Sequence, residues 1–368
     1  MSHKLKICFI IPTVKSGGIE TYLLRFLKYL NNSMDVTVLV RNTNKDELLE
    51  AYQKTGAHMV FQPLGNFNPS KMMWYYRFFK ENAFDAVCDF NANFAGQTMM
   101  LSKLAGVKKR ITFYRQSSHL FINPTKFRIA YSNFLNRLVY KYSTNIFANS
   151  ATGLKFFFKN EYPADKRFEV IKNGIELEEY ISPAPESKEQ LRQKLNLPAD
   201  KFIIGHTGRF TEAKNHYFLL DVAKRLIDAD SNIFFVLIGN DTDKLLPYIE
   251  KLKISDNVRV LGYKSNIPEY LKAFDMYFFP SVTEGQPNAL IEAMVTGLPV
   301  LTSDIAAIAE CLPQEGRHCL IDPYDVEATA QKFAELRNNS TTYIFKEYAV
   351  SNFDSGIQFK NFKDKLSD

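Results

Sequence analysis

The fold is decided by residues 6–40, which read KICFIIPTVKSGGIETYLLRFLKYLNNSMDVTVLV. Two short apolar runs, residues 6–11 and 35–40, flank a segment whose apolar residues are spaced for one face of a helix, namely Ile19, Leu23, Phe26 and Leu30. A strand, a helix and a second strand in this order form a βαβ unit, whose two strands run parallel. The opening of the chain therefore predicts an α/β domain with a parallel sheet.

Strand-like runs and helix-length segments go on alternating in two series along the 368 residues. In the first series, further strands are expected at residues 84–90, 110–114 and 145–149. The second series has six such runs, at residues 201–208, 232–239, 257–262, 274–280, 298–303 and 318–322. A chain of this length suits about two domains. We therefore expect an α/β fold of two parallel-sheet domains that face each other across a cleft.

Proline, serine and glutamate are frequent between the two series, in the segment ELEEYISPAPESKEQ at residues 176–190. This composition predicts the connection between the domains. Near the end of the chain, Ile357, Phe359 and Phe362 are enough apolar residues for a short helix, which we expect to pack back across the junction. The predicted parts are a first domain at residues 1–175, a second at 176–350 and a final helical segment at 351–368.

Basic residues are concentrated in the first domain, although the formal net charge of the whole chain is only +6. Residues 1–172 hold 25 Lys and Arg against 11 Asp and Glu, a balance of +14 that leaves −8 for the rest. Residues 101–150 have nine basic side chains, no acidic one and many aromatic ones. Such a surface suits anionic lipid headgroups or nucleic acid. Solvated helix faces would explain scattered lysines, but they explain less easily fifty residues without an acid.

The four cysteines, Cys8, Cys88, Cys311 and Cys319, have spacings that match neither a zinc knuckle nor a disulfide framework. We therefore expect buried thiols in a reducing compartment. The first residues, KLKICFIIP, lack the long apolar region and the cleavage site of a signal peptide. No apolar run approaches the roughly 18 to 20 residues that span a bilayer. These features predict a cytoplasmic protein that is at most peripheral to a membrane.

The first strand-to-helix turn, PTVKSGGIET, places Gly17 and Gly18 just before the expected helix. Glycines there let the backbone approach a ligand, and amides at a helix N-terminus favour an anion. A tight turn that simply needs glycine is an equal alternative. The turn is not G-x-G-x-x-G, and the second strand ends in VTVLVRN without the acid that would bind the ribose of a nicotinamide cofactor. A dehydrogenase is therefore disfavoured.

Two later turns carry charged residues. The turn GHTGRFTEAKNH contains Arg209 and Lys214, which could hold a diphosphate by a guanidinium fork and a point charge, or could be ordinary solvated cations. The segment TEGQPNALIEAM, residues 283–294, contains Glu284 on a loop and Glu292 on the helix that follows. Amides at that helix terminus could bind phosphate while the carboxylates bind hydroxyls. Alternatively, Glu292 could only complement the helix dipole.

Four segments occur together in this chain: SGGIE at residues 16–20, VIKNGIE at 170–176, GRFTEAK at 208–214 and EGQPNALIEA at 284–293. In this order they resemble the retaining nucleotide-sugar glycosyltransferases of family 4, the group 1 glycosyl transferases. The similarity covers about residues 6–335. It implies the GT-B fold, in which two Rossmann-like domains bind the acceptor and the nucleotide-sugar donor, respectively.

The resemblance also implies roles for individual residues. Glu284 would contact hydroxyls of the donor hexose, and Glu292 would contact the ribose. Arg209 and Lys214 would bind the diphosphate and stabilise it as the leaving group. The other implied donor contacts are the loop residues Gly17 and Gly18, the nucleobase region with Gly262, Tyr263 and Lys264, and the turn residues Gly285, Gln286, Pro287, Asn288 and Ala289.

One departure from the family pattern concerns the first domain. Members often carry a histidine at the end of a strand, near the reacting sugar. This sequence reads RITFYRQSSHLF, so Phe113 or Arg115 takes that position and His119 lies nearby. We expect Arg115 or His119 to act as the catalytic residue of this domain, and a packing or surface role for His119 remains the alternative.

No cofactor and no metal are expected beside the nucleotide-sugar co-substrate. The sequence Asp241-Thr242-Asp243 is a D-x-D pattern that other glycosyltransferases use to hold a metal, but its position predicts only an acidic turn. The predicted reaction transfers a hexose with retention to a lipid-linked or oligosaccharide acceptor in surface polysaccharide synthesis. The predicted partner is an anionic membrane surface, with no nucleic acid. A sugar-nucleotide epimerase or phosphorylase on the same fold, and a basic nucleic-acid-binding protein, are the alternatives.

Overall fold

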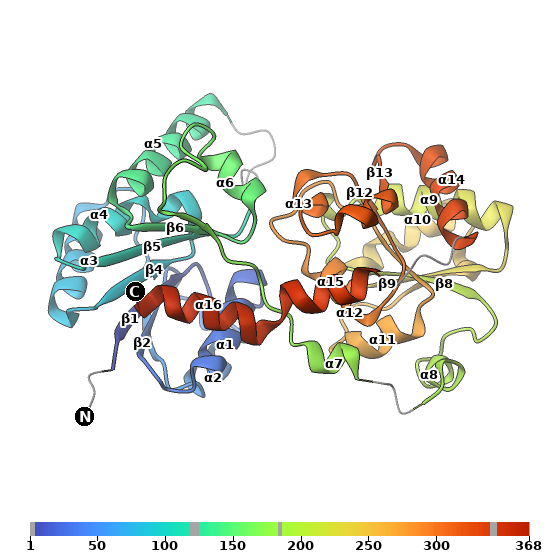
Figure 1. The fold of residues 1–368 in the computed structure, drawn as a ribbon, viewed down its shortest axis with the longest axis horizontal. Coiled ribbons are helices and arrows are strands. Elements are labelled where there is room, and N and C mark those ends of the chain that lie inside the picture. Colours follow the sequence, from blue (N-terminus) through green and yellow to red (C-terminus); the bar gives the residue numbers. More distant parts are fainter. Residues whose placement is uncertain (1–3, 118–124, 183–185, 339–343, 368) are drawn as a thin grey trace. The chain divides into compact units, whose positions relative to one another are not determined.

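The computed structural model describes residues 4–117, 125–182, 186–338 and 344–367. It divides the chain into two compact units, the first unit being Met1–Asn173 with Gly356–Asp368 and the second being Gly174–Ser355. Each unit contains one fully parallel sheet covered by helices (Figure 1). The predicted pair of parallel-sheet α/β domains is therefore confirmed.

The sheet of the first unit has seven strands among the described residues, in the order β3-β2-β1-β4-β5-β6-β7. The βαβ opening is present as predicted, since β1 pairs in parallel with β2 from Lys6 opposite Asp35 to Ile11 opposite Val40. The strands are β1 (Lys6–Ile11), β2 (Asp35–Val40), β3 (His58–Phe61), β4 (Ala86–Asp89), β5 (Lys109–Tyr114), β6 (Asn145–Ala148) and β7 (Phe168–Val170).

Helices cover both faces of this sheet and enclose two separate apolar cores. One face packs against α1 (Gly18–Leu30), α2 (Leu49–Gln53) and α16 (Ser355–Ser367). The other packs against α3 (Pro69–Asn82), α4 (Gly96–Leu104), α5 (Lys126–Tyr142), α6 (Ala151–Phe157) and the short η1 (Ala92–Ala95). The helix α16 is part of the apolar core on the α1 face of the sheet, because the rings of Phe26 and Phe362 lie 4.6 Å apart between centroids.

The sheet of the second unit has six strands among the described residues, in the order β10-β9-β8-β11-β12-β13. They are β8 (Phe202–Thr207), β9 (Ile233–Ile238), β10 (Val258–Val260), β11 (Met276–Phe279), β12 (Val300–Ser303) and β13 (Leu320–Ile321). Three of these strands, β9, β11 and β12, are wholly buried, as expected when helices cover both faces of a parallel sheet, and β8 is buried apart from Phe202.

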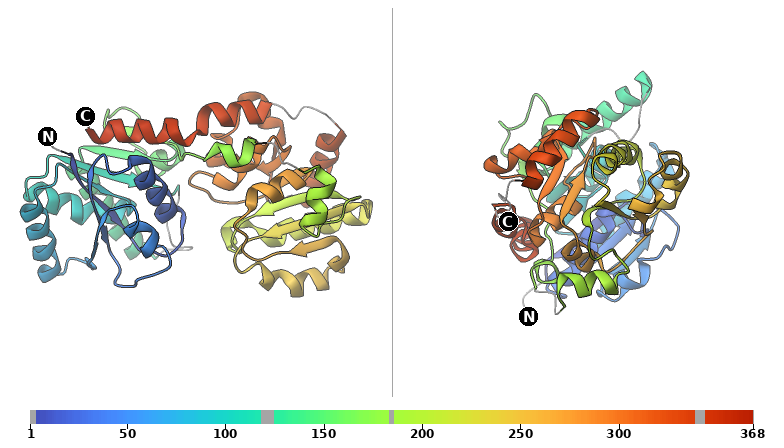
Figure 2. Two further views of the ribbon diagram at one scale, coloured as in Figure 1. Left: turned by 90° about the horizontal axis from the view of Figure 1, so that it is seen from below. Right: turned by 90° about the vertical axis from the view of Figure 1, so that its right-hand side faces the viewer.

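Two helical layers cover the second sheet (Figure 2). One contains α7 (Leu177–Ile181), α8 (Lys188–Lys194), α11 (Ile267–Ala273), α12 (Asn288–Thr296), α13 (Ala306–Ala309) and α15 (Ile344–Phe353). The other contains α9 (His216–Ala229), α10 (Leu246–Lys251) and α14 (Val326–Asn338). Short 3-10 turns complete the unit: η2 (Glu212–Lys214), η3 (Thr242–Leu245), η4 (Ser255–Asn257) and η5 (Gln314–Cys319).

Three local expectations were wrong. The strands β3 and β7 were not predicted, because both are short edge strands with partly exposed polar residues and so lack a strong apolar run. Much of the segment expected to connect the domains is helical and packs in the core of the second unit through Leu177, Tyr180 and Leu191. In α16, Ile357 is exposed, and only Phe359 and Phe362 of the three predicted apolar residues are buried. All four cysteines are free and buried, as predicted.

Candidate active site

Predicted donor-binding residues gather at the carboxyl edge of the second sheet. The strands β8 and β11 are parallel neighbours, so the turns that follow them leave the sheet side by side. The backbone N–H of Val282 donates a hydrogen bond of 2.9 Å to the carbonyl of Ala213 and joins the two turns directly. This contact brings together two segments that lie about seventy positions apart in the sequence.

An ion pair between Lys214 and Glu284 lies at the centre of this edge. The Lys214 Nζ is 2.6 Å from the Glu284 Oε1, and the side chains are 21% and 12% exposed. The same ammonium lies 4.6 Å from the centroid of the Phe279 ring, the last residue of β11. Two residues expected to bind different parts of one donor, its diphosphate and its sugar, therefore contact each other in this structure.

The turn with Arg209 is fixed by close backbone packing. Gly239, which follows β9, has a φ of 158°, and a Cβ on it would overlap the carbonyl oxygen of Gly208. The Gly239 N–H donates to the carbonyl of Gly262 over 2.8 Å. Glycine is thus required where the turns after three neighbouring strands meet. Arg209 is exposed at this edge.

The helix α12 begins beside the ion pair. Pro287 is its N-cap residue and Gln286 is buried just before it. The N–H of Asn288 donates to the Gln286 carbonyl over 3.0 Å, which closes the turn predicted to bind phosphate. Gly285 and Ala289 flank this turn and are partly buried.

Tyr277 is a buried residue of β11 near the two predicted carboxylates of this edge. Its hydroxyl lies 2.7 Å from the Thr207 Oγ1 at the end of β8. Burial raises the pKa of Tyr277, and the negative charges of Glu292 and Glu284 raise it further. Both carboxylates are therefore close enough to Tyr277 to affect its ionisation. Sequence reasoning did not find Tyr277, because a tyrosine inside an apolar strand gives no separate signal.

The predicted nucleobase region follows β10. Gly262 has a positive φ of 38°, and a Cβ on it would meet nothing within 4 Å. Tyr263 is 71% exposed, so its ring is available to a ligand. Lys264 lines an adjoining open hollow together with Arg259 and Lys194.

Two buried histidines lie behind Lys214 and were not assigned a role from the sequence. The ring centroids of His206 and His216 are 4.9 Å apart, and the His206 Nδ1 lies 2.9 Å from the carbonyl of Phe278. Burial and, to a smaller extent, the charge of Lys214 lower the pKa of His216 to about 4. Burial likewise moves the pKa of His206 well below its ordinary value. Near pH 7 both imidazoles are therefore neutral and add no charge beside Lys214.

In the first unit, Gly17 is the N-cap residue of α1 and Gly18 is the first helical residue. The Glu20 side chain turns back toward them, because its Oε2 lies 2.5 Å from the position of a Cβ on Gly17. Glu20 is buried, and burial raises the pKa of its carboxyl group, while a hydrogen bond from its own backbone amide and the charge of Arg115 act in the opposite direction. The loop that was expected to bind an anion therefore already holds a carboxylate.

Arg115 directly follows β5 at the carboxyl edge of the first sheet. Its guanidinium carbon lies 3.8 Å from the centroid of the Tyr22 ring in α1. Burial lowers the pKa of Arg115 to about 10, so the side chain remains charged near pH 7. Phe113, the other residue considered for this position, is fully buried and stacks on Phe90 at 5.2 Å between centroids. His119 lies outside the described residues.

Asp241 and Asp243 lie at the start of η3, and Asp241 pairs with Lys244 at 2.9 Å. Within residues 4–117, 125–182, 186–338 and 344–367, no three His, Cys, Asp or Glu side chains lie together as a metal site would require. No described helix is long and apolar enough to cross a membrane.

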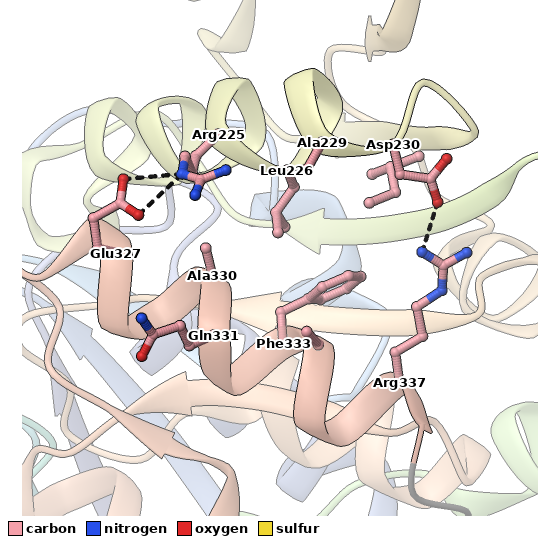
Figure 3. Close-up of a pocket in the computed structure, with 11 residues that line it drawn as sticks. Arg225, Leu226, Ala229, Asp230, Glu327, Ala330, Gln331, Phe333 and Arg337 are labelled. Atoms are coloured by element: carbon pink, nitrogen blue, oxygen red, sulfur yellow. Dashed lines mark hydrogen bonds and ion pairs between the residues drawn. The ribbon is translucent and has the colours of Figure 1, made fainter.

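A separate groove of about 390 Å³ lies on the helical side of the second unit, between α9 and α14 (Figure 3). Its floor contains Leu226 and Phe333, and ion pairs of Arg225 with Glu327 and Arg337 with Asp230 lie toward its two ends. None of the predicted donor residues lines it.

Two α/β units in one chain, each with a parallel sheet and with charged turns at its carboxyl edge, are typical of GT-B glycosyltransferases. The family model "Glycosyltransferase Family 4" matches residues 16–179, and the model "Glycosyl transferases group 1" matches residues 187–350. Together the two matches extend through most of both units. The chain belongs to this glycosyltransferase family.

Individual relatives and solved structures agree with this assignment. The chain is 27% identical over 312 residues to the putative glycosyltransferase EpsF of Bacillus subtilis, covering 82% of this chain and 80% of EpsF. It is 27% identical to the capsular polysaccharide biosynthesis glycosyltransferase CapH of Staphylococcus aureus, covering 83% of each. The crystal structure of Anabaena HepE in complex with UDP is similar in fold, with a TM-score of 0.82, 19% identity and coverage of 99% of this chain and 100% of that one. The alternatives of an epimerase, a phosphorylase or a nucleic-acid-binding protein are not favoured.

Proposed function

We propose that this glycosyltransferase moves a hexose from a nucleoside-diphosphate sugar to an acceptor hydroxyl with retention of configuration. The observation that carries this proposal is the ion pair of Lys214 with Glu284, which joins the two turns implied to hold the diphosphate and the sugar. A donor that binds there gives each partner a new contact, since the diphosphate attracts Lys214 and a sugar hydroxyl donates to Glu284.

The leaving diphosphate is stabilised by residues of the second unit. Lys214 and Arg209 supply two positive charges, and the amides at the start of α12 supply hydrogen-bond donors as negative charge develops. Glu292, one turn into the helix, accepts hydrogen bonds from the ribose hydroxyls. No metal ion is assigned a step, because these groups can neutralise the leaving group themselves. Arg115 or His119 of the first unit acts near the reacting sugar.

A uridine nucleotide is the first donor to test. HepE, which is similar in fold, has been crystallised with UDP and with UDP-glucose. The exposed ring of Tyr263 and the open space at Gly262 offer a flat surface for a base at the end of β10.

The acceptor that we propose is a lipid-linked sugar at an anionic membrane surface on the cytoplasmic side. One relative, 28% identical over 247 residues, is an Escherichia coli galactosyltransferase whose acceptor is named as a diphosphoundecaprenol-linked sugar. In the first unit, α5 exposes Phe127, which is 80% exposed, and Phe134 together with the cations Lys126, Arg137 and Lys141. Aromatic rings beside lysine and arginine suit the headgroup region of an anionic bilayer.

The donor part of the proposal is tested by ligand-induced thermal stabilisation with UDP-, GDP-, ADP- and dTDP-linked sugars. One of them should raise the melting temperature, because a ligand that binds only the folded state stabilises it. Folded protein that responds to none of the four would refute the donor assignment. Cosedimentation with phosphatidylglycerol vesicles at low and high salt tests the membrane part, and no binding at low salt would refute that part alone.

A further inference from the structure

Two oppositely charged side chains lie at the carboxyl edge of the first sheet without forming an ion pair among the described residues: Glu20, which is buried, and Arg115, which is partly exposed but has an enclosed Nη1. Glu20 is 5% exposed, and its carboxylate lies at the start of α1. Among the described residues, no ion pair joins it to Arg115, and the enclosed Nη1 of Arg115 has no hydrogen-bond partner. An enclosed polar atom without a hydrogen-bond partner, such as this Nη1, is costly, and folded proteins keep few such atoms. The two side chains are therefore candidates for contact with a ligand.

A third polar side chain, Asn149, reaches the same place from the neighbouring strand. The Asn149 N–H donates to the carbonyl of Tyr114 over 3.1 Å, so Asn149 lies beside Arg115 at the end of β6. Its side chain is 4% exposed, and its Oδ1 has no hydrogen-bond partner in the described part of the chain. Phe113 lies two residues before Arg115, Phe147 lies two residues before Asn149, and both rings pack in the core under α1. Because side chains alternate between the two faces along a strand, Arg115 and Asn149 point to the same α1 face.

A role in helix capping explains only part of this arrangement. A carboxylate at a helix N-terminus is favoured by about 0.3–1 kcal/mol, which fits Glu20. Capping does not account for the enclosed Nη1 of Arg115 or for the Oδ1 of Asn149. The position of Glu20 also restricts the ligand, because its negative charge would repel an anion that approached Gly17.

We infer that Glu20, Arg115 and Asn149 form a subsite for neutral sugar hydroxyls of the acceptor, an inference that rests on the proposed function. A hydroxyl group both donates and accepts hydrogen bonds. It can donate to the carboxylate of Glu20 or the Oδ1 of Asn149 and accept from the Nη1 of Arg115. A fully ionised phosphate group can only accept, and Glu20 repels it. The chemistry of the three side chains thus favours a polyhydroxylated ring over a charged group.

The test is ligand-observed saturation-transfer NMR on the full chain with the methyl glycosides of glucose, galactose and N-acetylglucosamine. Wild type should bind at least one of them, and Glu20→Ala and Arg115→Lys should reduce that signal about fivefold or more. Glu20→Gln keeps the shape of the side chain, so it is less disruptive to folding than Glu20→Ala. It should give an intermediate reduction of the glycoside signal. The matched control is Glu50→Gln, because Glu50 is an exposed carboxylate of the same unit that pairs with Lys54 at 2.6 Å. It should bind like wild type.

Donor stabilisation of the two Glu20 variants separates this inference from the proposed function. Loss of glycoside binding with unchanged stabilisation by UDP-glucose supports an acceptor subsite. Loss of both glycoside binding and UDP-glucose stabilisation in Glu20→Gln would overturn the inference, since Glu20 would then serve the donor. No glycoside binding by wild type, or equal binding by all variants, would also overturn it. If wild type binds glycosides as expected but no nucleotide sugar, the donor assignment fails while the subsite stands.

Discussion

Opposite charges meet at the carboxyl edge of the second sheet and stay apart at the corresponding edge of the first. Lys214 and Glu284 are 2.6 Å apart and partly exposed, whereas Glu20 is buried, Arg115 has an enclosed Nη1, and these two form no ion pair among the described residues. A partly exposed pair can exchange its contact for a ligand at modest cost, because water reaches both groups. At the first edge, the enclosed Nη1 of Arg115 lacks a hydrogen-bond partner among the described residues, and a ligand can supply one. The two edges are thus suited to a charged and a neutral substrate, respectively.

The largest effect is expected from Lys214→Ala, which removes the cation of the ion pair with Glu284. Turnover with the nucleotide sugar found in the screen should fall by about 10²–10³-fold, because a cation beside the leaving diphosphate is lost. The measurement is kcat at saturating donor. Lys224→Ala is the control, since Lys224 is an exposed lysine of α9 that pairs with Asp228. A Lys214→Ala enzyme with wild-type kcat would contradict the assigned role.

The next prediction concerns the two neutral histidines, His206 and His216, that lie behind Lys214. The pKa of His216 in the folded protein, about 4, lies below its unfolded value of about 6.5. The unfolded chain therefore binds a proton first as the pH falls. Stability should decrease by roughly 3 kcal/mol between pH 6.5 and 4, and burial of His206 acts in the same direction.

Urea unfolding at pH 7 and pH 4.5 measures this loss. His216→Gln should lose less stability than wild type over the same interval, because one of the two titrating groups is gone. His318→Gln, which changes an exposed imidazole of the same unit, should lose as much as wild type. An equal acid loss in wild type and His216→Gln would show that His216 does not carry the effect.

A smaller effect should separate the two carboxylates near Tyr277. Glu292→Ala should weaken UDP binding about tenfold, because hydrogen bonds from the ribose hydroxyls to a charged group are lost. Glu284→Ala should chiefly reduce turnover. Calorimetry with UDP and steady-state kinetics measure the two quantities, and Glu335→Ala on α14 is an exposed control. If both variants change UDP affinity and turnover alike, the division of roles is wrong.

The smallest effect is expected at the groove of Figure 3, where the pairing is exposed and no substrate is assigned. The Nε of Arg225 lies 3.0 Å from Glu327, and the side chains are 48% and 64% exposed. Arg225→Ala should change the free energy of unfolding by less than about 1 kcal/mol, as is usual for exposed ion pairs. Urea unfolding tests this value. A clear loss of donor affinity in this variant would show that the groove serves the donor site.

Much of the fold could be predicted because apolar runs mark buried strands. The strands β1, β2, β9 and β11 were found within a few residues, since wholly apolar runs between turns leave little choice. The edge strands β3 and β7 were missed because half-exposed strands mix polar and apolar residues. The end of the first unit was expected near residue 175, and the structure changes units between Asn173 and Gly174.

The candidate site was predictable to the extent that its residues carry charge on glycine-rich turns. Arg209, Lys214 and Glu284 stand out in the sequence for this reason, and Glu292 stands out by its spacing from Glu284. The contact between Lys214 and Glu284 could not be predicted, because it depends on β8 and β11 being neighbours in the sheet. The enclosed Glu20 was read only as part of the SGGIE motif, since a glutamate early in a helix gives no sign of its burial.

The last helix, α16, has a consequence for how the protein is synthesised. Phe359, Phe362 and Leu366 fill the core of the first unit, although residues 174–355 of the second unit are made before them. On the ribosome, part of the apolar core of the first unit therefore stays open until the second unit has been translated. A chain that stops within the second unit lacks α16 and exposes aromatic surface that chaperones and proteases can recognise.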